Sequence, residues 1–245
     1  MPGADQRSDL SGLTTRDLAR RILLRHKSTV RVKKEHVATE NLAVIIEATL
    51  KLANRSGFHS MSLRDLSRET GLSMGALYAY FDGKDTLLSM ILDTVAGVVE
   101  EVLGRPPERY SDDPLARLRW LLATHIHLTE AMLPWFVFVY MEAKAFPPKA
   151  RAMAVASERR TEAMIAETLE AGRARGLLVC EDAAMTASLI KPMIQDWYVK
   201  RGKYRRRGVT AELYAANLIG FVERAIGLDA ESSRRAPRAA LKGAA

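Results

Sequence analysis

A glycine turn between two short helical segments is the most constraining feature of this sequence. Ser62 can cap a helix that begins at Leu63, because its hydroxyl can accept a hydrogen bond from a backbone N–H of the first turn. Gly71 can adopt positive φ and end that helix, and Ser73 can cap a second, short one. Two short helices joined in this way form a helix-turn-helix, whose second helix fits the major groove of DNA.

The expected outer face of the second helix carries no charge, whereas an exposed helix is usually lined with Lys and Glu. Small side chains permit close approach to base edges, and tyrosine hydroxyls can bond phosphate oxygens. Arg64 and Arg68 precede this helix and Lys84 follows it, so positive charge flanks the face. The alternative is that its tyrosines belong to the core and the arginines only solubilise. The face comprises Met74, Gly75, Ala76, Tyr78, Ala79 and Tyr80.

This region resembles the DNA-binding domain of the tetracycline-repressor (TetR) family of transcriptional regulators. The matching segments are ATLKLA (48–53), GF (57–58), SLRDLS (62–67), GLSMGALYAYF (71–81) and KDTLL (84–88). The resemblance implies an all-helical homodimer with a three-helix DNA-binding head and a larger helical body that binds a small-molecule effector. It also implies that the operator is faced by Arg64, Met74, Gly75, Ala76, Tyr78, Tyr80 and Lys84, to which we add the capping residues Ser62 and Ser73.

The helical patterns divide the chain into four parts. We predict a basic N-terminal extension (1–35), a helix-turn-helix domain (36–83), a ligand-binding and dimerisation domain (84–228) and a disordered basic tail (229–245). The helix expected from Lys84 to Leu103 joins head and body. The fold class is all-α, with about nine helices plus an extra N-terminal one, since no alternating strand pattern of useful length occurs.

The N-terminal extension is an addition to the family pattern. An apolar stripe formed by Leu18, Ile22 and Leu23 predicts a short helix with a threonine cap. Residues 16–34 also contain eight Lys and Arg against a single Asp. Such a run suits phosphates or a minor groove beside an operator. The alternative is an arm that packs on its own body, and the sequence leaves both interpretations open.

Composition narrows the class of partner. The net charge of +8 favours polyanions, nucleic acid first. The single cysteine, Cys180, excludes an intramolecular disulfide framework and a cysteine-based zinc site, so we expect a reduced, cytoplasmic location. No apolar run is long enough to cross a bilayer and the first residues are polar, so we expect neither a signal peptide nor a membrane partner.

Catalytic and metal-binding patterns are missing from the sequence. His125 and His127 are two residues apart on a predicted helix, where they diverge. No zinc-protease motif, phosphate-binding glycine loop or nucleophile elbow occurs. We therefore expect no enzyme activity, no catalytic residue, no metal and no cofactor. A helical enzyme or binding module with an incidental helical corner, and a nonspecific architectural DNA-binding protein, are the competing interpretations.

The body contains soft and aromatic side chains that suit an adaptable apolar pocket. Residues 200–207 include six Lys and Arg, which would suit the phosphates of an amphiphile such as an acyl-CoA; the analogy with acyl-CoA-responsive regulators of this family supports that idea. A drug-like or aromatic effector, as in efflux regulation, is the alternative. Any of the apolar residues could equally be core. The candidate ligand-binding residues are Trp135, Phe136, Val139, Tyr140, Met164, Met193, Trp197, Tyr198, Arg201 and Arg205.

The last two predicted helices, 181–200 and 210–227, are apolar over a wider arc than one neighbour covers. In the family the corresponding pair forms a four-helix bundle with its two-fold mate, which would match a palindromic operator. The alternative is that both helices are internal. Repression that an effector relieves is the expected function, with activation and corepression as the alternatives.

Overall fold

The structure, a computed structural model, describes Leu10 and residues 12–228. Within these residues all regular elements are helices, so the expected all-α fold class is confirmed. The predicted disordered tail, 229–245, lies outside the described residues. The α-helices are α2 (Thr15–Arg25), α3 (Glu35–Ser56), α4 (Leu63–Thr70), α5 (Met74–Tyr78), α6 (Lys84–Leu103), α7 (Pro114–Ala131), α8 (Leu133–Glu142), α9 (Pro148–Ala174), α10 (Ala183–Val199), α11 (Arg201–Arg206) and α12 (Ala211–Ala225).

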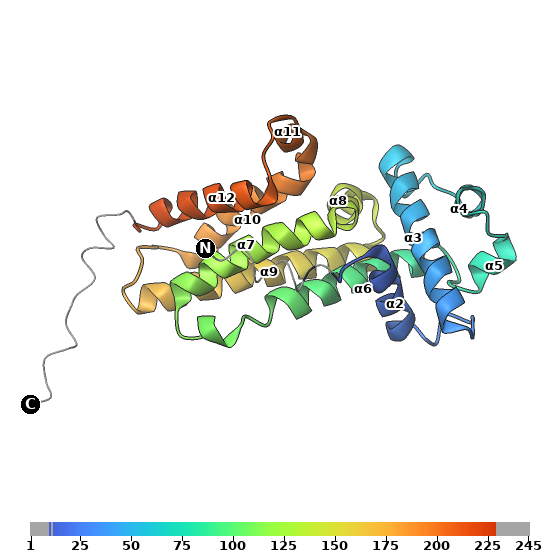
Figure 1. Ribbon diagram of the computed structural model, residues 1–245, viewed down its shortest axis with the longest axis horizontal. Coiled ribbons are helices and arrows are strands. Elements are labelled where there is room, and N and C mark those ends of the chain that lie inside the picture. Colours follow the sequence, from blue (N-terminus) through green and yellow to red (C-terminus); the bar gives the residue numbers. More distant parts are fainter. Residues whose placement is uncertain (1–9, 11, 229–245) are drawn as a thin grey trace, which may run out of the picture.

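The molecule is elongated, with the head at one end and the body at the other (Figure 1). The helices α3, α4 and α5 form the head, and α6 runs from the head into the body, where it packs against α7 and α9. The helices α10 and α12 contact each other, while α10 packs mainly on α9 and α12 mainly on α7. The short helices η1 (Glu108–Tyr110) and η2 (Ala143–Ala145) follow α6 and α8.

Local capping chemistry builds the head as predicted. The Ser62 hydroxyl accepts a hydrogen bond from the backbone N–H of Asp65 at 3.1 Å, and the Asp65 carboxylate accepts one from the N–H of Ser62 at 3.0 Å. The Ser62 hydroxyl also donates to the Asp65 carboxylate at 2.6 Å, and this bond, together with the one from the Ser62 N–H, lowers the pKa of Asp65. Gly71 ends α4 with a φ of 71°, and the Ser73 hydroxyl caps α5. The turn geometry of a helix-turn-helix therefore follows from three residues.

The extension packs on its own chain, against the head and the connecting helix α6, which is closer to the second of its two interpretations. Leu18, Ala19 and Ile22 of α2 are buried against α3 and α6. The Arg25 guanidinium donates to the backbone carbonyl of Asp93 on α6 at 2.6 Å. Other arginines of the extension form exposed ion pairs, which contribute little stability each: Arg16 with Glu40, Arg20 with Glu35, Arg21 with Glu101 and Arg31 with Asp82.

The short helix α11 has no counterpart among the predicted elements. Its Tyr204 is buried, with ring centroids 5.6 Å from Trp197 and 4.8 Å from Tyr214. Its first residue, Arg201, makes two hydrogen bonds of 2.8 Å to the carboxylate of Glu130 on α7. The aromatic packing and the ion pair hold this basic segment against the body.

Among the described helices, none is by itself long and apolar enough to cross a bilayer. One adjoining pair, Pro114–Ala131 with Leu133–Ala145, meets the length and composition test together, across a bend of 92°.

Candidate DNA-binding surface and effector cavity

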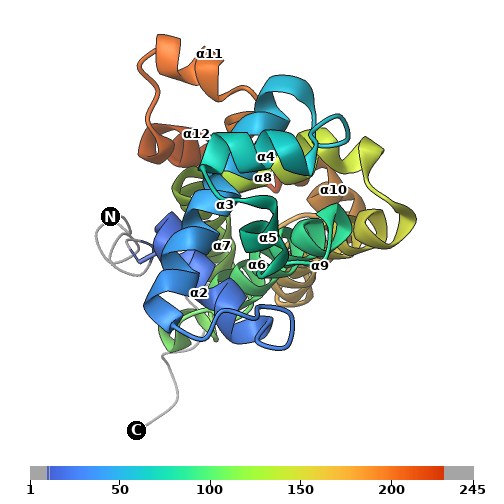
Figure 2. The same cartoon turned by 90° about the vertical axis from the view of Figure 1, so that its right-hand side faces the viewer.

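The predicted DNA-facing residues gather at the head end of the molecule, where α4 and α5 face outward (Figure 2). On α5, Gly75 and Tyr78 are exposed, Tyr78 by 43% of its surface. Met74 and Ala76 are partly buried, and none of the residues on this face carries a charge. Ser62, Arg64 and Ser73 are exposed beside it. An exposed, uncharged helix face with polar and basic residues beside it is what a helix needs to enter the major groove of DNA.

Tyr80 does not belong to that outer face, and its predicted exposure is wrong. Its side chain is 1% exposed, and its hydroxyl accepts a hydrogen bond from the side-chain amide of Asn41 at 2.7 Å. Burial raises the pKa of Tyr80, and the bond to Asn41 opposes that rise. The cause is the end of α5 at Tyr78: the chain then leaves the helical path, and Tyr80 turns toward α3.

Lys84, the first residue of α6, is held against the loop that precedes α4. Its ammonium donates to the backbone carbonyl of His59 at 2.8 Å and lies 5.0 Å from the ring centroid of Phe58. Partial burial lowers the pKa of Lys84. The side chain thus joins the connecting helix to the head, besides carrying charge near the expected DNA surface.

A cavity of about 510 Å³ lies within the body, between helices α6 to α10. Four of the predicted ligand-binding residues line it: Phe136, Val139, Tyr140 and Tyr198. The Tyr198 ring centroid lies 5.8 Å from Phe136 and 5.9 Å from Tyr140. The remaining lining residues are Val95, Val99, His125, Met141, Ala143, Lys144, Ala154, Val155, Ser157, Glu158, Thr161, Lys191 and Gln195.

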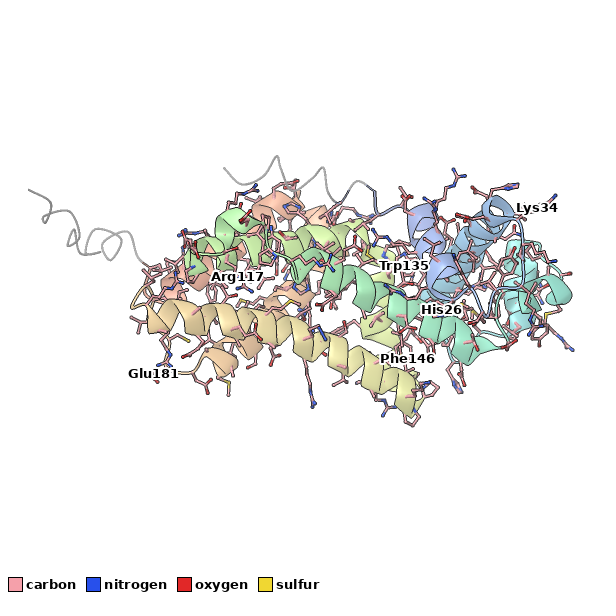
Figure 3. The ribbon with its side chains drawn as sticks, turned by 90° about the horizontal axis from the view of Figure 1, so that it is seen from below. His26, Lys34, Arg117, Trp135, Phe146 and Glu181 are labelled. Atoms are coloured by element: carbon pink, nitrogen blue, oxygen red, sulfur yellow. The ribbon has the colours of Figure 1, made fainter. Side chains whose placement is uncertain are left out.

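The structure places the other predicted ligand-binding residues elsewhere. Trp135 lines a separate hollow of about 730 Å³ where α8 meets α2 and α3, at the junction of body and head (Figure 3). Met164 lies in a groove beside α6 and α9. Trp197 is fully buried core, stacked with Tyr214 at 5.0 Å. Met193 is partly buried, and its carbonyl accepts the hydroxyl of Tyr214.

Arg201 and Arg205, the two basic residues that were predicted to bind the ligand, do not line the cavity. Arg201 is engaged by Glu130, and its guanidinium lies 4.4 Å from the ring centroid of Trp197. Arg205 is exposed on α11. The charge of Arg201 is therefore already balanced within the protein, which raises the pKa of that guanidinium further.

Sequence reasoning missed a polar cluster in the cavity. Lys191 is 6% exposed, and its ammonium donates to the hydroxyl of Thr161 and lies 3.5 Å from Nε2 of the buried His125. Nearby, the Gln195 amide donates to the carboxylate of Glu158. In the sequence, this cluster could have been recognised from Lys191, a lone lysine among apolar residues of α10. Among the described residues no cluster of His, Cys, Asp and Glu could hold a metal ion.

The helix α8 connects the cavity with the head. Phe136, Val139 and Tyr140 face the cavity, whereas the Phe138 ring meets that of Phe58 edge-on at 5.5 Å. At its end, the Glu142 carboxylate accepts a hydrogen bond from the backbone N–H of Phe58 at 2.7 Å. A shift of α8 caused by a ligand would therefore reach the loop between α3 and α4.

Two family profiles match the two parts of the chain. Residues 45–91 match bacterial regulatory proteins of the tetR family, and residues 111–220 match the tetracyclin repressor-like C-terminal domain. Together they cover the helix-turn-helix and most of the body, including all the residues that line the cavity except Val95 and Val99.

Curated relatives and solved structures agree with the profiles. The chain is 26% identical over 179 residues to the HTH-type transcriptional regulator HbdR of Aromatoleum sp. (strain CIB), covering 73% of this chain and 78% of that protein. It is 31% identical over 108 residues to the HTH-type transcriptional repressor KstR of Rhodococcus jostii, covering 41% and 50%.

Among solved structures, the TetR family regulator PfmR from Thermus thermophilus superposes with a TM-score of 0.58 at 23% identity, covering 76% of this chain and 98% of that one. A tetR-family regulatory protein from Rhodococcus RHA1 gives 0.65 at 18% identity, covering 76% and 96%. These likenesses concern the fold. With its helix-turn-helix, its helical body and the two profile matches, this chain belongs to the TetR family of transcriptional regulators.

Proposed function

We propose that two copies of this chain form a repressor that binds a palindromic DNA operator and that a small apolar or amphiphilic effector releases it. The observation that carries the proposal is the exposed, uncharged face of α5, where Gly75 and Tyr78 stand clear of the head. One α5 from each protomer would enter a major groove, with Arg64 and Lys84 supplying charge beside the phosphates. The proposal requires no cofactor besides the effector and places the protein in the cytoplasm.

Dimerisation is supported by exposed apolar side chains on the two helices that the family uses for it. Met185 and Leu189 on α10 are 57% and 64% exposed, and Leu213 and Phe221 on α12 are 50% and 53% exposed. Large exposed apolar patches on a protein surface mark interaction sites. The helices α10 and α12 contact each other, so a two-fold mate would complete a four-helix bundle.

Release would follow from coupling between the cavity and the head. An effector that fills the cavity touches α6 through Val95 and Val99, and α8 through Phe136 and Val139. Both helices contact the head, α6 through Lys84 and α8 through Glu142. If the effector prefers one placement of the heads by about 1–3 kcal/mol, DNA affinity changes roughly 5- to 150-fold.

Repression, rather than activation, is supported by the relative KstR, which is a transcriptional repressor by name. An acyl-CoA is one amphiphile of the proposed class, and a drug-like or aromatic effector is the alternative within the same mechanism. The architectural DNA-binding role has less support, because several arginines of the extension pair with acidic side chains of the same chain.

Two experiments test the proposal. The first selects the duplexes that the protein binds from a random-sequence pool, and the second measures the affinity of two Gly75 variants for the selected duplex. A Cβ at Gly75 would meet only the Ser73 hydroxyl, at 4.0 Å, so Gly75→Ala fits the fold; because Gly75 is exposed, the longer side chain of Gly75→Leu can extend into solvent. We expect a palindromic sequence to be enriched. We also expect Gly75→Leu to weaken binding roughly tenfold or more, because its bulk blocks close approach to the bases. Gly75→Ala should bind nearly as wild type. Enrichment of no duplex, or unchanged binding by Gly75→Leu, would contradict the proposal.

A further inference from the structure

We infer that the effector is a monocarboxylate with an apolar body, and that its carboxylate pairs with Lys191 on the floor of the 510 Å³ cavity. This inference rests on the proposed effector role of the cavity and names the chemical class that the cavity takes. The charge of Lys191, the polar floor of the cavity and its mostly apolar walls match the two parts of such a ligand.

Lys191 is a buried cation that forms no ion pair with any carboxylate in the part of the chain that the structure describes. Its ammonium has one close partner, the neutral hydroxyl of Thr161, and a distant contact to Nε2 of His125 at 3.5 Å. No carboxylate of the described residues forms an ion pair with it; Glu158 and Glu162 act only through longer-range attraction. A buried charge is costly unless a partner of opposite charge and hydrogen bonds compensate it. An anionic ligand group would provide that partner.

The cavity is polar at its floor and mostly apolar along its walls, where Lys144, Ser157, Glu158 and Gln195 are the polar exceptions. The floor is formed by Lys191, His125 and Thr161, all at most 6% exposed. Toward solvent, Tyr140 and Met141 are 44% and 58% exposed and form the mouth. Between them stand mostly apolar side chains: Val95, Val99, Phe136, Val139, Ala154 and Tyr198. A volume of about 510 Å³ suits a small organic molecule.

This polarity fixes the direction in which a ligand enters. A ligand that enters with its carboxylate first places that group against the Lys191 ammonium and its apolar body against the walls. An acyl-CoA that enters with its acyl chain first would place the apolar end of the chain against the ammonium. The first arrangement pairs each part of the ligand with a matching surface, whereas the second leaves the charge of Lys191 uncompensated.

The groups around Lys191 leave its charge sensitive to pH. Burial lowers the pKa of Lys191 to about 8, against an opposing effect of Glu158 and Glu162 on α9. On α7, burial and the neighbouring ammonium lower the pKa of His125 well below its usual value, so the imidazole is neutral near pH 7. The other lining residues with ionisable side chains are Tyr140, Lys144 and Tyr198. A bound carboxylate adds the negative charge that keeps Lys191 protonated.

Calorimetric titration with matched probes tests the inference. The probes are decanoate and 4-phenylbutyrate, each compared with the alcohol of the same carbon skeleton, and decanoyl-CoA. We expect the wild-type protein to bind at least one carboxylate about tenfold or more tighter than its alcohol, because a charge-assisted bond in a buried site is strong. Lys191→Met, of similar length and apolar, should lose that preference while still binding the alcohol. Glu158→Gln, which removes a nearby negative charge, should keep or strengthen carboxylate binding.

A measurement on the wild-type protein alone decides the matter even if Lys191→Met fails to fold. Above pH 8 the affinity for the carboxylate should fall by up to about tenfold per pH unit, as Lys191 loses its proton, while the affinity for the alcohol stays constant. The inference is overturned if neither carboxylate binds tighter than its alcohol, if decanoyl-CoA binds tighter than decanoate, or if the pH profiles of acid and alcohol coincide.

The results of these ligand-binding experiments do not depend on whether the repressor proposal is correct. Binding of the probes is measured without DNA, and the duplex selection is carried out without probes. A protein that prefers the carboxylates but enriches no duplex would support the site and contradict the repressor. A protein that enriches a palindrome but shows no preference for carboxylates would do the reverse.

Discussion

The carboxylate of Glu142, at the end of α8, accepts a hydrogen bond of 2.7 Å from the backbone N–H of Phe58, in the loop that leads from α3 to α4. The two residues are 84 positions apart, and they join the wall of the cavity to the DNA-binding head. Because Phe58 also lies beneath the Lys84 ammonium, the two helices that contact the cavity and the head, α6 and α8, meet at this residue. We regard this contact as the route by which the body influences the head.

Glu142→Ala should weaken the contact between the end of α8 and the loop that leads to α4. Without the carboxylate the partly buried N–H of Phe58 has lost its acceptor, which costs about 1–3 kcal/mol of stability. Amide hydrogen exchange of the segment 57–62 should accelerate more than exchange of α7 or α9. Glu142→Gln keeps an acceptor oxygen and serves as the control. Equal exchange in wild type and Glu142→Ala would contradict the assigned role.

Tyr80→Phe should lower stability and leave DNA binding almost unchanged. The substitution removes the buried hydroxyl that accepts from Asn41, and a hydrogen bond of this kind contributes about 1 kcal/mol. Denaturant unfolding measures the loss. If Tyr80→Phe instead lost operator affinity at unchanged stability, Tyr80 would act at the DNA surface after all.

Ile22→Ala should destabilise the protein by about 2–5 kcal/mol, because Ile22 is fully buried where α2 packs on the head and α6. Thermal unfolding provides the measurement. Arg20→Gln, which changes an exposed residue of the same helix, is the control and should alter the melting temperature little. An unchanged melting temperature for Ile22→Ala would mean that the extension does not belong to the core.

The double variant Leu213→Glu, Phe221→Glu should be monomeric, because like charges on α12 would face each other across a two-fold interface. Sedimentation at micromolar concentration distinguishes monomer from dimer. Operator affinity should fall with the dimer, since each protomer would bind a half-site alone. A variant that still sediments as a dimer would place the interface elsewhere.

Local chemistry made the head predictable, and distant contacts limited the prediction of the body. Ser62, Gly71 and Ser73 act within a few residues of themselves, so their capping roles can be read from spacing. Tyr80 was misplaced because the end of α5 at Tyr78 depends on how the turn meets α3.

In the body, the partners lie far apart in sequence. Arg201 resembles a free cation until Glu130, 71 residues earlier, is placed beside it. From the sequence alone, Lys191 cannot be distinguished from a surface lysine. The residues that contact its ammonium, Thr161 and His125, lie on two other helices. An apolar stripe also gives no distinction between core and cavity wall, which is why Trp197 was grouped with Phe136.

The most direct test of the repressor proposal is a titration of the selected palindromic duplex with wild type and with Tyr78→Ala, monitored by fluorescence anisotropy. We expect two protomers per duplex for the wild type and a loss of affinity of roughly tenfold or more for Tyr78→Ala, at an unchanged melting temperature and dimer content. Equal affinity of the two proteins, or saturation at one protomer per palindrome, would contradict it.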